Sequence, residues 1–286
     1  MIKATETLRH LINGALGIAG LRLTRNRNRI AELEAENARL RTKSEAGSEA
    51  PLTQGDLCLR QILTQFGITI VFDVGASFGQ YAERLRRIGY SGRIVSFEPQ
   101  SAVFSILHEK ARGDINWEAV CLALGDLEIS KNINISRNSW SSSFLPIVPQ
   151  ILEIEPMIES AGAESVSVKL LDQIYTDFAS PTDKTFLKLD VQGYEPNVLA
   201  GASEFLCSCH AIQMELALVP SYRGQTLFPE MLELMRQSKF QLVYLEPGFW
   251  DLRSGFLLET DGIFVREEDL DRCFTHLPPP GDAHQR

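Results

Sequence analysis

The stretch that decides the fold is "VFDVGASFGQYAERL", residues 71–85. An apolar run at 71–74 has the composition of a buried strand, and the turn that follows contains Gly75 and Gly79. Apolar residues then return at helical spacing. A strand, a tight turn and a helix leave backbone N–H groups pointing at one place, so this segment predicts a ligand-binding turn at the edge of an α/β sheet.

The same turn narrows the choice of ligand. Its glycines do not match the G-x-G-x-x-G fingerprint of dinucleotide sites, and no Gly-Lys-Ser/Thr follows for a triphosphate loop. Asp73, directly before the turn, would repel a phosphate but would suit an amine or a sulfonium. A purely structural glycine turn is the alternative interpretation.

From about residue 52 to 266, short apolar strands alternate with helical segments. This alternation predicts a doubly wound, mostly parallel seven-stranded sheet covered by helices on both faces. The expected strands are 68–74, 93–97, 117–123, 185–191, 211–215, 241–245 and 262–265, and the expected helices are 56–66, 79–89, 101–112, 195–206 and 226–238. An insertion at 130–170, with an extra strand at "KNINISRN" and a loop at "WSSSF", is predicted to cover a substrate.

The first 50 residues are predicted to form a separate helical segment. Leu23, Ile30 and Asn37 repeat every seven residues, with Leu33 and Leu40 at the complementary positions, so residues 23–43 are expected to make a homo-oligomer through a short coiled coil. A single solvated helix is the alternative. Residues 51–268 form the predicted globular domain, and 269–286 the predicted flexible tail.

Charge and cysteine content restrict partners and compartment. The 286 residues carry a formal net charge of -9, which argues against a nucleic-acid partner. Five scattered cysteines without nearby metal-ligand histidines predict reduced thiols in a cytoplasmic protein. The apolar run 11–21 is too short to span a bilayer, but with the arginines that follow it, residues 8–29 are a candidate for peripheral contact with the inner membrane face.

Polar residues follow the strands where ligands bind in open parallel sheets. Glu98 and Pro99 follow the second strand, and Glu98 lies where nucleotide folds place a carboxylate for ribose hydroxyls. Ala123, Gly125 and Asp126 follow the third, leaving room for a flat ring. A helix cap and a simple turn are the respective alternatives.

The fourth and fifth strands bring candidate catalytic groups. Lys188 and Asp190 share one side of their strand, Glu195 begins the next helix, and Glu215 ends the fifth strand. A carboxylate here can deprotonate a hydroxyl, with Asp190 as the first candidate, and Lys188 can stabilise an oxyanion. The alternatives are a structural ion pair with a helix-start Glu, or a divalent cation held by Asp190, Glu195 and Glu215, which we do not favour.

Six segments together resemble one known family. They are "FDVGASFGQY", "SFEPQ", "LALGD", "VKLLDQI", "LKLDVQGYEPNVLAG" and "MELAL", in that order over about residues 68–265. The chain resembles the FkbM-type class I methyltransferases, with a Rossmann-like fold. The family typically carries Glu where Gln192 stands.

The resemblance implies a reaction and a cofactor. It implies transfer of a methyl group from S-adenosylmethionine to an oxygen, typically a sugar or natural-product hydroxyl. The turn, with Asp73, Gly75, Ala76, Gly79 and Tyr81, would then hold the methionine part of the cofactor. Glu98 with Pro99 would hold the ribose, and residues 123–126 the adenine. A nicotinamide-dependent oxidoreductase and a non-catalytic oligomeric scaffold are the alternatives.

Overall fold

The computed structural model describes residues 51–274, with side chains described as far as residue 270. The predicted coiled coil at 23–43 and the membrane-contact segment at 8–29 lie outside these residues and stay predictions. Residues 269–274 of the predicted tail lie in helix α9 (Glu267–Phe274). No helix in the described part is long and apolar enough to cross a membrane.

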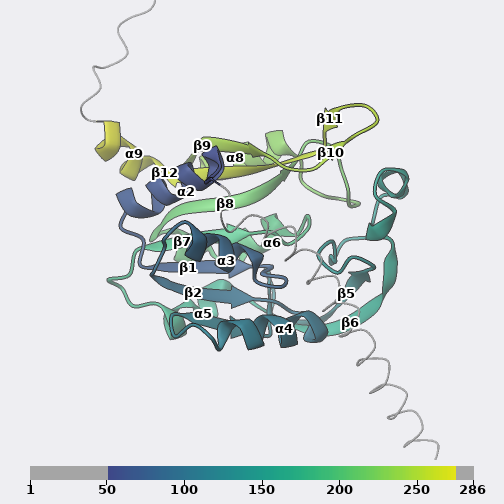
Figure 1. Cartoon of the computed structure of the whole chain (residues 1–286), viewed down its shortest axis with the longest axis horizontal. Coiled ribbons are helices and arrows are strands. Elements are labelled where there is room, and N and C mark those ends of the chain that lie inside the picture. The colour runs from purple at the N-terminus through teal and green to yellow at the C-terminus, as the bar shows by residue number, and fades with distance from the viewer. Residues whose placement is uncertain (1–50, 275–286) are drawn as a thin grey trace, which may run out of the picture. The chain divides into compact units, whose positions relative to one another are not determined.

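A seven-stranded sheet forms the centre of the domain, as predicted, in the order β3-β2-β1-β7-β8-β12-β9 (Figure 1). β12 pairs antiparallel with both neighbours, and the other pairs are parallel. Strand order reverses between β1 and β7, which places a ligand-binding crevice at their carboxyl ends. The strands are β1 (Ile70–Val74), β2 (Arg93–Phe97), β3 (Trp117–Val120), β7 (Thr185–Leu189), β8 (Cys209–Ala217), β9 (Phe240–Pro247) and β12 (Glu259–Arg266).

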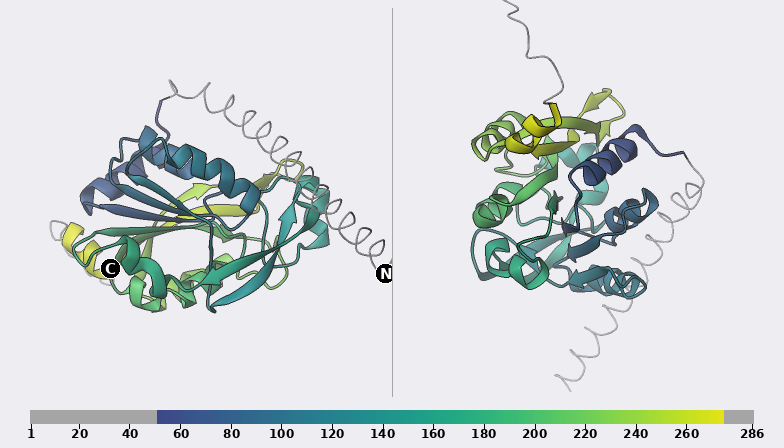
Figure 2. Two further views of the ribbon diagram at one scale, coloured as in Figure 1. Left: turned by 90° about the horizontal axis from the view of Figure 1, so that it is seen from below. Right: turned by 90° about the vertical axis from the view of Figure 1, so that its left-hand side faces the viewer.

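Helices cover both faces of this sheet (Figure 2). One face packs α2 (Gln54–Gln65), α3 (Gln80–Arg87) and α4 (Ser101–Ala111) on residues such as Val71 and Phe186. The other packs α5 (Leu171–Phe178), α6 (Glu195–Ala200), α7 (Ser203–Leu206) and α8 (Phe228–Gln237) on residues such as Phe72 and Leu187. Consecutive residues of a strand therefore pack into the hydrophobic cores on opposite faces of the sheet. This explains why the strands are continuous apolar runs in the sequence.

The third predicted strand is the main correction among the sheet strands. The segment 117–123 does not form one strand: β3 ends at Val120, whose carbonyl accepts the N–H of Leu122 in a tight turn. β4 (Ala123–Leu124) then pairs with a different sheet. The predicted helix 195–206 also breaks, at Gly201, where any Cβ would overlap the carbonyl oxygen of Gly125.

The insertion is more ordered than predicted. The strand expected at 131–138 is present as β5 (Ile129–Ser136), but β6 (Ser160–Lys169) and helix α5 were not predicted. β4, β6 and β5 form a three-stranded sheet, and β6 is joined to β5 through η1 (Pro149–Glu153) and η2 (Pro156–Ile158). A hairpin of β10 (Trp250–Asp251) and β11 (Phe256–Leu257) connects β9 to β12 (Figure 1).

Candidate active site

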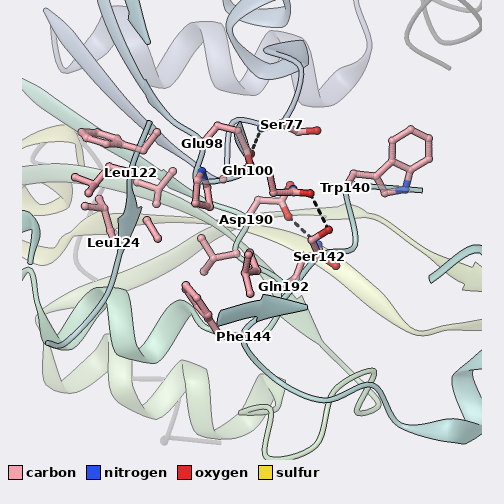
Figure 3. Close-up of a pocket in the computed structure, with 17 residues that line it drawn as sticks. Ser77, Glu98, Gln100, Leu122, Leu124, Trp140, Ser142, Phe144, Asp190 and Gln192 are labelled. Carbon is pink, nitrogen blue, oxygen red and sulfur yellow. Dashed lines mark hydrogen bonds between the residues drawn. The ribbon is translucent and has the colours of Figure 1, made fainter. Parts of the chain in front are cut away.

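A pocket lies at the carboxyl ends of β1, β2 and β7, where the strand order reverses (Figure 3). It is lined by Val74, Gly75, Ser77, Phe97, Glu98, Pro99, Gln100, Leu122, Ala123, Leu124, Ile133, Trp140, Ser142, Phe144, Asp190, Val191 and Gln192. The wall is thus apolar toward β4 and the insertion, and polar toward β1, β2 and β7.

The glycine turn begins directly after β1. Gly75 has a φ of +75°, and a Cβ there would overlap the carbonyl oxygen of Asp190, so only glycine fits. The N–H groups of Gly75 and Ala76 donate to Phe97 O, both at 3.0 Å. Gly79, with a φ of +85°, begins α3 close against the Trp117 ring. The turn is therefore fixed by contacts within the chain, and the N–H groups of Gly75 and Ala76, expected from the sequence to face a ligand, bind a carbonyl of the chain.

Glu98 lies at the bottom of the pocket and binds two loop N–H groups. One oxygen accepts from Ser77 N at 3.0 Å and the other from Gln100 N at 2.8 Å. Burial raises the pKa of Glu98 to about 7, and these hydrogen bonds partly offset that rise. The Ser77 Oγ is buried and makes no hydrogen bond within the described residues. Pro99 lines the pocket beside them.

Asp73 is fully buried and does not line the pocket. Its carboxylate accepts from Ser96 Oγ at 3.0 Å and lies 3.7 Å from Lys188 Nζ. Burial raises its pKa, against the opposing effect of Lys188. The partner of the carboxylate in this structure is therefore a lysine of the chain, whereas the sequence suggested a ligand cation.

Lys188 lies between the two aspartates. Its Nζ is 3.1 Å from Asp190 Oδ2 and stands 5.4 Å from the centre of the Tyr81 ring. Burial alone would lower the pKa of Lys188, but the carboxylates of Asp190 and Asp73 raise it above its ordinary value. Tyr81 donates to Gln213 Oε1 at 2.8 Å and, like Lys188, does not line the pocket.

The segment 123–126 contributes to the pocket only in part. Ala123 lines it together with Leu122 and Leu124. Gly125 instead permits close packing, because a Cβ there would press on Val168 and Tyr194. Asp126 accepts from Tyr194 Oη at 3.2 Å, so its carboxylate faces a side chain of the chain itself.

Asp190 is the carboxylate most open to the pocket, with 40% of its side chain exposed. Oδ2 faces Lys188, and Oδ1 accepts from Gln192 Nε2 at 2.9 Å (Figure 3). Glu195, in contrast, is buried at the start of α6, where one oxygen accepts from Val191 N at 3.0 Å and Gly193 N at 3.3 Å. Burial raises the pKa of Glu195 to about 7. Its contacts shape the loop that presents Asp190.

Further carboxylates gather beyond Asp190, from β8 and the start of β12. Glu215 accepts from Gln192 Nε2 at 3.1 Å, and Glu259 accepts from Ser221 Oγ at 2.8 Å. Burial raises the pKa of Glu215 well above its ordinary value and the pKa of Asp261 to about 6. Burial thus disfavours the charged form of these carboxyl groups. No group of three or more possible metal ligands with suitable geometry occurs in residues 51–274.

The insertion supplies a wall that the sequence did not assign to particular residues. Gln100 Nε2 donates to Ser139 O at 3.1 Å, and Ser142 Oγ donates to Gln100 Oε1 at 3.1 Å (Figure 3). These bonds bring Phe144 against the apolar side of the pocket and Trp140, 38% exposed, to its edge. The serine-rich "WSSSF" was the available signal, and it predicted only a loop.

Comparison with known protein families decides the assignment. The family model of the FkbM methyltransferase domain matches residues 73–242, more than half of the chain. The chain belongs to this family. The resemblance predicted from the six segments is confirmed, and methyl transfer from S-adenosylmethionine is the chemistry of the family. The nicotinamide alternative is thereby set aside.

Several solved methyltransferases resemble this FkbM methyltransferase in structure. Magnesium protoporphyrin IX methyltransferase from Synechocystis, solved with S-adenosylmethionine, has 11% identity and a TM-score of 0.42, with 74% of this chain and 78% of that chain covered. The plantazolicin methyltransferase, solved with S-adenosylhomocysteine, has 11% identity and a TM-score of 0.41, with 83% and 98% covered. An rRNA methylase from Streptococcus thermophilus has 10% identity and a TM-score of 0.41, with 76% and 99% covered. No curated protein matches the chain.

The pocket fits S-adenosylmethionine, the cofactor of the family. Ser77 offers a buried hydroxyl without a hydrogen-bond partner among the described residues, and Glu98 offers a carboxylate that can accept from hydroxyls. The apolar wall of Leu122, Leu124 and Phe144 suits a flat ring.

Proposed function

We propose that this FkbM methyltransferase transfers the methyl group of S-adenosylmethionine to a hydroxyl oxygen of a saccharide. The observation that carries the proposal is Asp190, a half-exposed carboxylate at the wall of the cofactor pocket, beyond the glycine turn. A methyl donor is already activated, so the protein has to align the acceptor and remove its proton. A sugar hydroxyl ionises far above neutral pH and therefore needs such a base.

The pocket residues support one placement of the cofactor. The methionine end would lie against the 75–79 turn, with the Ser77 hydroxyl within its reach. The ribose hydroxyls would donate to Glu98. The adenine would lie between Leu122, Ala123 and Phe144. Asp73 acts from behind the turn by holding Lys188, and Lys188 in turn holds Asp190.

Asp190 is preferred as the base over Glu195 and Glu215. Neither Glu195 nor Glu215 lines the pocket. One oxygen of Glu195 accepts from two backbone N–H groups, and Glu215 accepts from Gln192 Nε2. Bound S-adenosylmethionine would supply the activated methyl group, leaving as S-adenosylhomocysteine. Asp190 would take the proton of the acceptor hydroxyl as its oxygen receives the methyl group.

The carboxylates on and beyond the Asp190 wall of the pocket favour an acceptor with hydroxyl groups. Asp190, Glu215, Glu259 and Asp261 present acceptor oxygens, and Lys188 is already engaged with two carboxylates. Such a wall suits a donor-rich polyol and repels phosphate or carboxylate close to the reacting atom. These charges support a saccharide whose reactive end is neutral.

A screen with methyl-labelled S-adenosylmethionine tests the proposal. Neutral mono- and oligosaccharides are compared with nucleotide sugars and with amine acceptors, and the labelled product is located by NMR. We expect an O-methyl saccharide as the product. Label found only on nitrogen or carbon would overturn the proposal.

The base is tested in the same assay with Asp190→Asn. We expect the transfer rate to fall about 10²- to 10⁴-fold, as for loss of a general base. Affinity for S-adenosylmethionine, measured by calorimetry, should stay within about twofold, because the proposed contacts to the cofactor come from Ser77, Glu98 and the apolar wall and not from Asp190. Asp177→Asn, at an exposed site on α5, is the matched control. A variant that keeps full activity would exclude Asp190 as the base.

A further inference from the structure

Gln192 lies between the cofactor pocket, which it lines, and the carboxylates of β8 and β12. Its backbone has a φ of +56°, a left-handed conformation that residues other than glycine adopt rarely. Its carbonyl oxygen accepts from the buried Ser143 Oγ at 2.6 Å, which attaches the loop after β7 to the insertion. This conformation is therefore held in place from outside the loop.

The side chain of Gln192 makes three hydrogen bonds to three different segments. Nε2 donates to Asp190 Oδ1 at 2.9 Å and to Glu215 Oε2 at 3.1 Å. Oε1 accepts from Tyr222 Oη at 2.8 Å. Tyr222 is buried in the loop after β8, and its hydroxyl also lies 2.9 Å from Ser141 O in the insertion. One amide thus joins the ends of β7 and β8 and two loops.

The charges around this amide are almost all negative. Two carboxylates meet at its single nitrogen, and without a donor between them they would repel each other. Lys188 reaches only the other oxygen of Asp190. The titratable groups that face the cluster are Asp73 on β1, Lys188 on β7, Asp190 directly after β7, Glu195 on α6, Glu215 on β8, Tyr222 in its loop, and Glu259 and Asp261 on β12.

With the neighbours of this chain, an amide makes hydrogen bonds that an ionised glutamate, the residue typical of the family at this position, cannot make. It donates two protons and accepts through its oxygen while carrying no charge. A glutamate of the same shape could still accept from Tyr222, but its second oxygen would face Asp190 and Glu215 without a proton to offer. It would have to take up a proton, and its single O–H could then replace only one of the two N–H donors.

We propose that Gln192 is a positioning residue: a neutral bridge that separates the charges of Asp190 and Glu215 and joins Asp190 to the Tyr222 loop. The bridge follows from the contacts alone, and only its part in proton removal rests on the proposed function. With Gln192 on Oδ1 and Lys188 on Oδ2, the Asp190 carboxylate is held in one orientation, with its exposed edge toward the pocket.

Thermal unfolding as a function of pH tests the bridge without any substrate. In Gln192→Glu, the pKa of the new carboxyl is raised in the folded state by its neighbours, so the destabilisation is present at high pH and disappears as pH falls toward the unfolded value of about 4.3. We expect a melting temperature about 5 °C below the parent at pH 8 and about 1 °C below it at pH 5. Parallel curves for the two proteins would overturn the proposal.

Two further variants separate charge from shape. Gln61→Glu, at an exposed site on α2, makes the same charge change and should follow the parent at every pH. Gln192→Leu has no polar atom, so acid should not rescue it and its deficit should persist at pH 5. If Gln192→Leu recovered at pH 5 as well, acid rescue would not report the bridge and the proposal would fail.

The affinity for S-adenosylmethionine, measured by calorimetry, tests the proposed function separately from the bridge. We expect Gln192→Glu to bind the cofactor within about threefold of the parent, because no contact from the Gln192 side chain reaches Glu98 or the glycine turn. A parent that binds no cofactor would refute the proposed function and leave the melting result intact. Once a saccharide acceptor is in hand, the ascending limb of kcat against pH should move to higher pH in Gln192→Glu, while the KM for the cofactor stays nearly unchanged.

Discussion

The two halves of the pocket are built in different ways. Around β1 and β2, backbone groups make the site: the Gly75 turn presses on the Asp190 carbonyl, and Glu98 binds the N–H groups of Ser77 and Gln100. Around β7 and β8, side chains from distant segments make it: Lys188, Gln192 and Tyr222 hold Asp190 and Glu215. The cofactor half therefore depends on the local chain, and the acceptor half on tertiary contacts.

The largest expected effect on stability comes from adding a side chain at Gly75. Gly75→Ala places a Cβ into the Asp190 carbonyl and also strains a φ of +75°. We expect a loss of about 3 kcal/mol in the free energy of unfolding, since overpacking costs about 1–3 kcal/mol and left-handed backbone about 1–2 kcal/mol. Chemical denaturation measures it. Gly89 has a φ of +90° and nothing within 4 Å of an added Cβ, so Gly89→Ala should lose only the free energy that the left-handed backbone costs. Equal losses in the two variants would mean that the contact with the Asp190 carbonyl contributes nothing.

The carboxylate of Glu98 should have the next largest effect. Glu98→Gln removes one acceptor oxygen and the negative charge, so cofactor affinity should fall about 10- to 100-fold, equivalent to about 1.5–3 kcal/mol for a hydrogen bond to a charged group. Calorimetry with S-adenosylmethionine measures this. Glu118→Gln, exposed on β3, should bind as the parent does. Unchanged affinity in Glu98→Gln would place the ribose elsewhere.

The pH dependence of cofactor binding also tests whether the Glu98 carboxylate binds the ribose. The pKa of Glu98 is about 7 in the folded protein, and ribose hydroxyls favour its charged form. As pH falls from 8 to 6 the carboxylate is protonated, so affinity should weaken by about tenfold. In Glu98→Gln this slope should disappear. A slope that survives the substitution would point to another group, such as Glu195.

The smallest effect is expected in the half built from side chains. Tyr222→Phe removes the hydroxyl that bonds Gln192 Oε1 and Ser141 O, which should lower the free energy of unfolding by about 1 kcal/mol. Tyr244→Phe, whose hydroxyl makes no hydrogen bond to another described side chain or backbone group, is the control for denaturation. An equal loss in both variants would mean that the Tyr222 hydroxyl contributes nothing.

Sequence patterns predicted the cofactor half better than the acceptor half. The glycine turn and the position of Glu98 follow from local spacing, since a strand edge and its turn are contiguous in the chain. Asp73 was expected at a ligand cation, and its actual partner, Lys188, lies 115 positions further on. The bridging role of Gln192 likewise depends on Tyr222 and Ser143, which no local pattern relates to it.

The predicted seven-stranded sheet is confirmed because parallel strands buried on both faces are continuous apolar runs. The elements missed lie where that signal is weak. β6 alternates polar and apolar residues only in its second half, with buried Val166 and Val168, and α5 is a short helix of eight residues. The break after Val120 depends on the pairing of β4 with β6, which is a tertiary contact.

The close approach of Gly75 to the Asp190 carbonyl bears on how a change in the surrounding loops can alter the choice of acceptor. It fixes by main chain alone how far the cofactor turn stands from the carboxylate beside it. Changes in the insertion or in the loop after β8 can therefore alter the shape of the acceptor cleft while that spacing stays the same. A graft of another acceptor-binding loop onto this scaffold should accordingly leave the geometry of the cofactor turn intact.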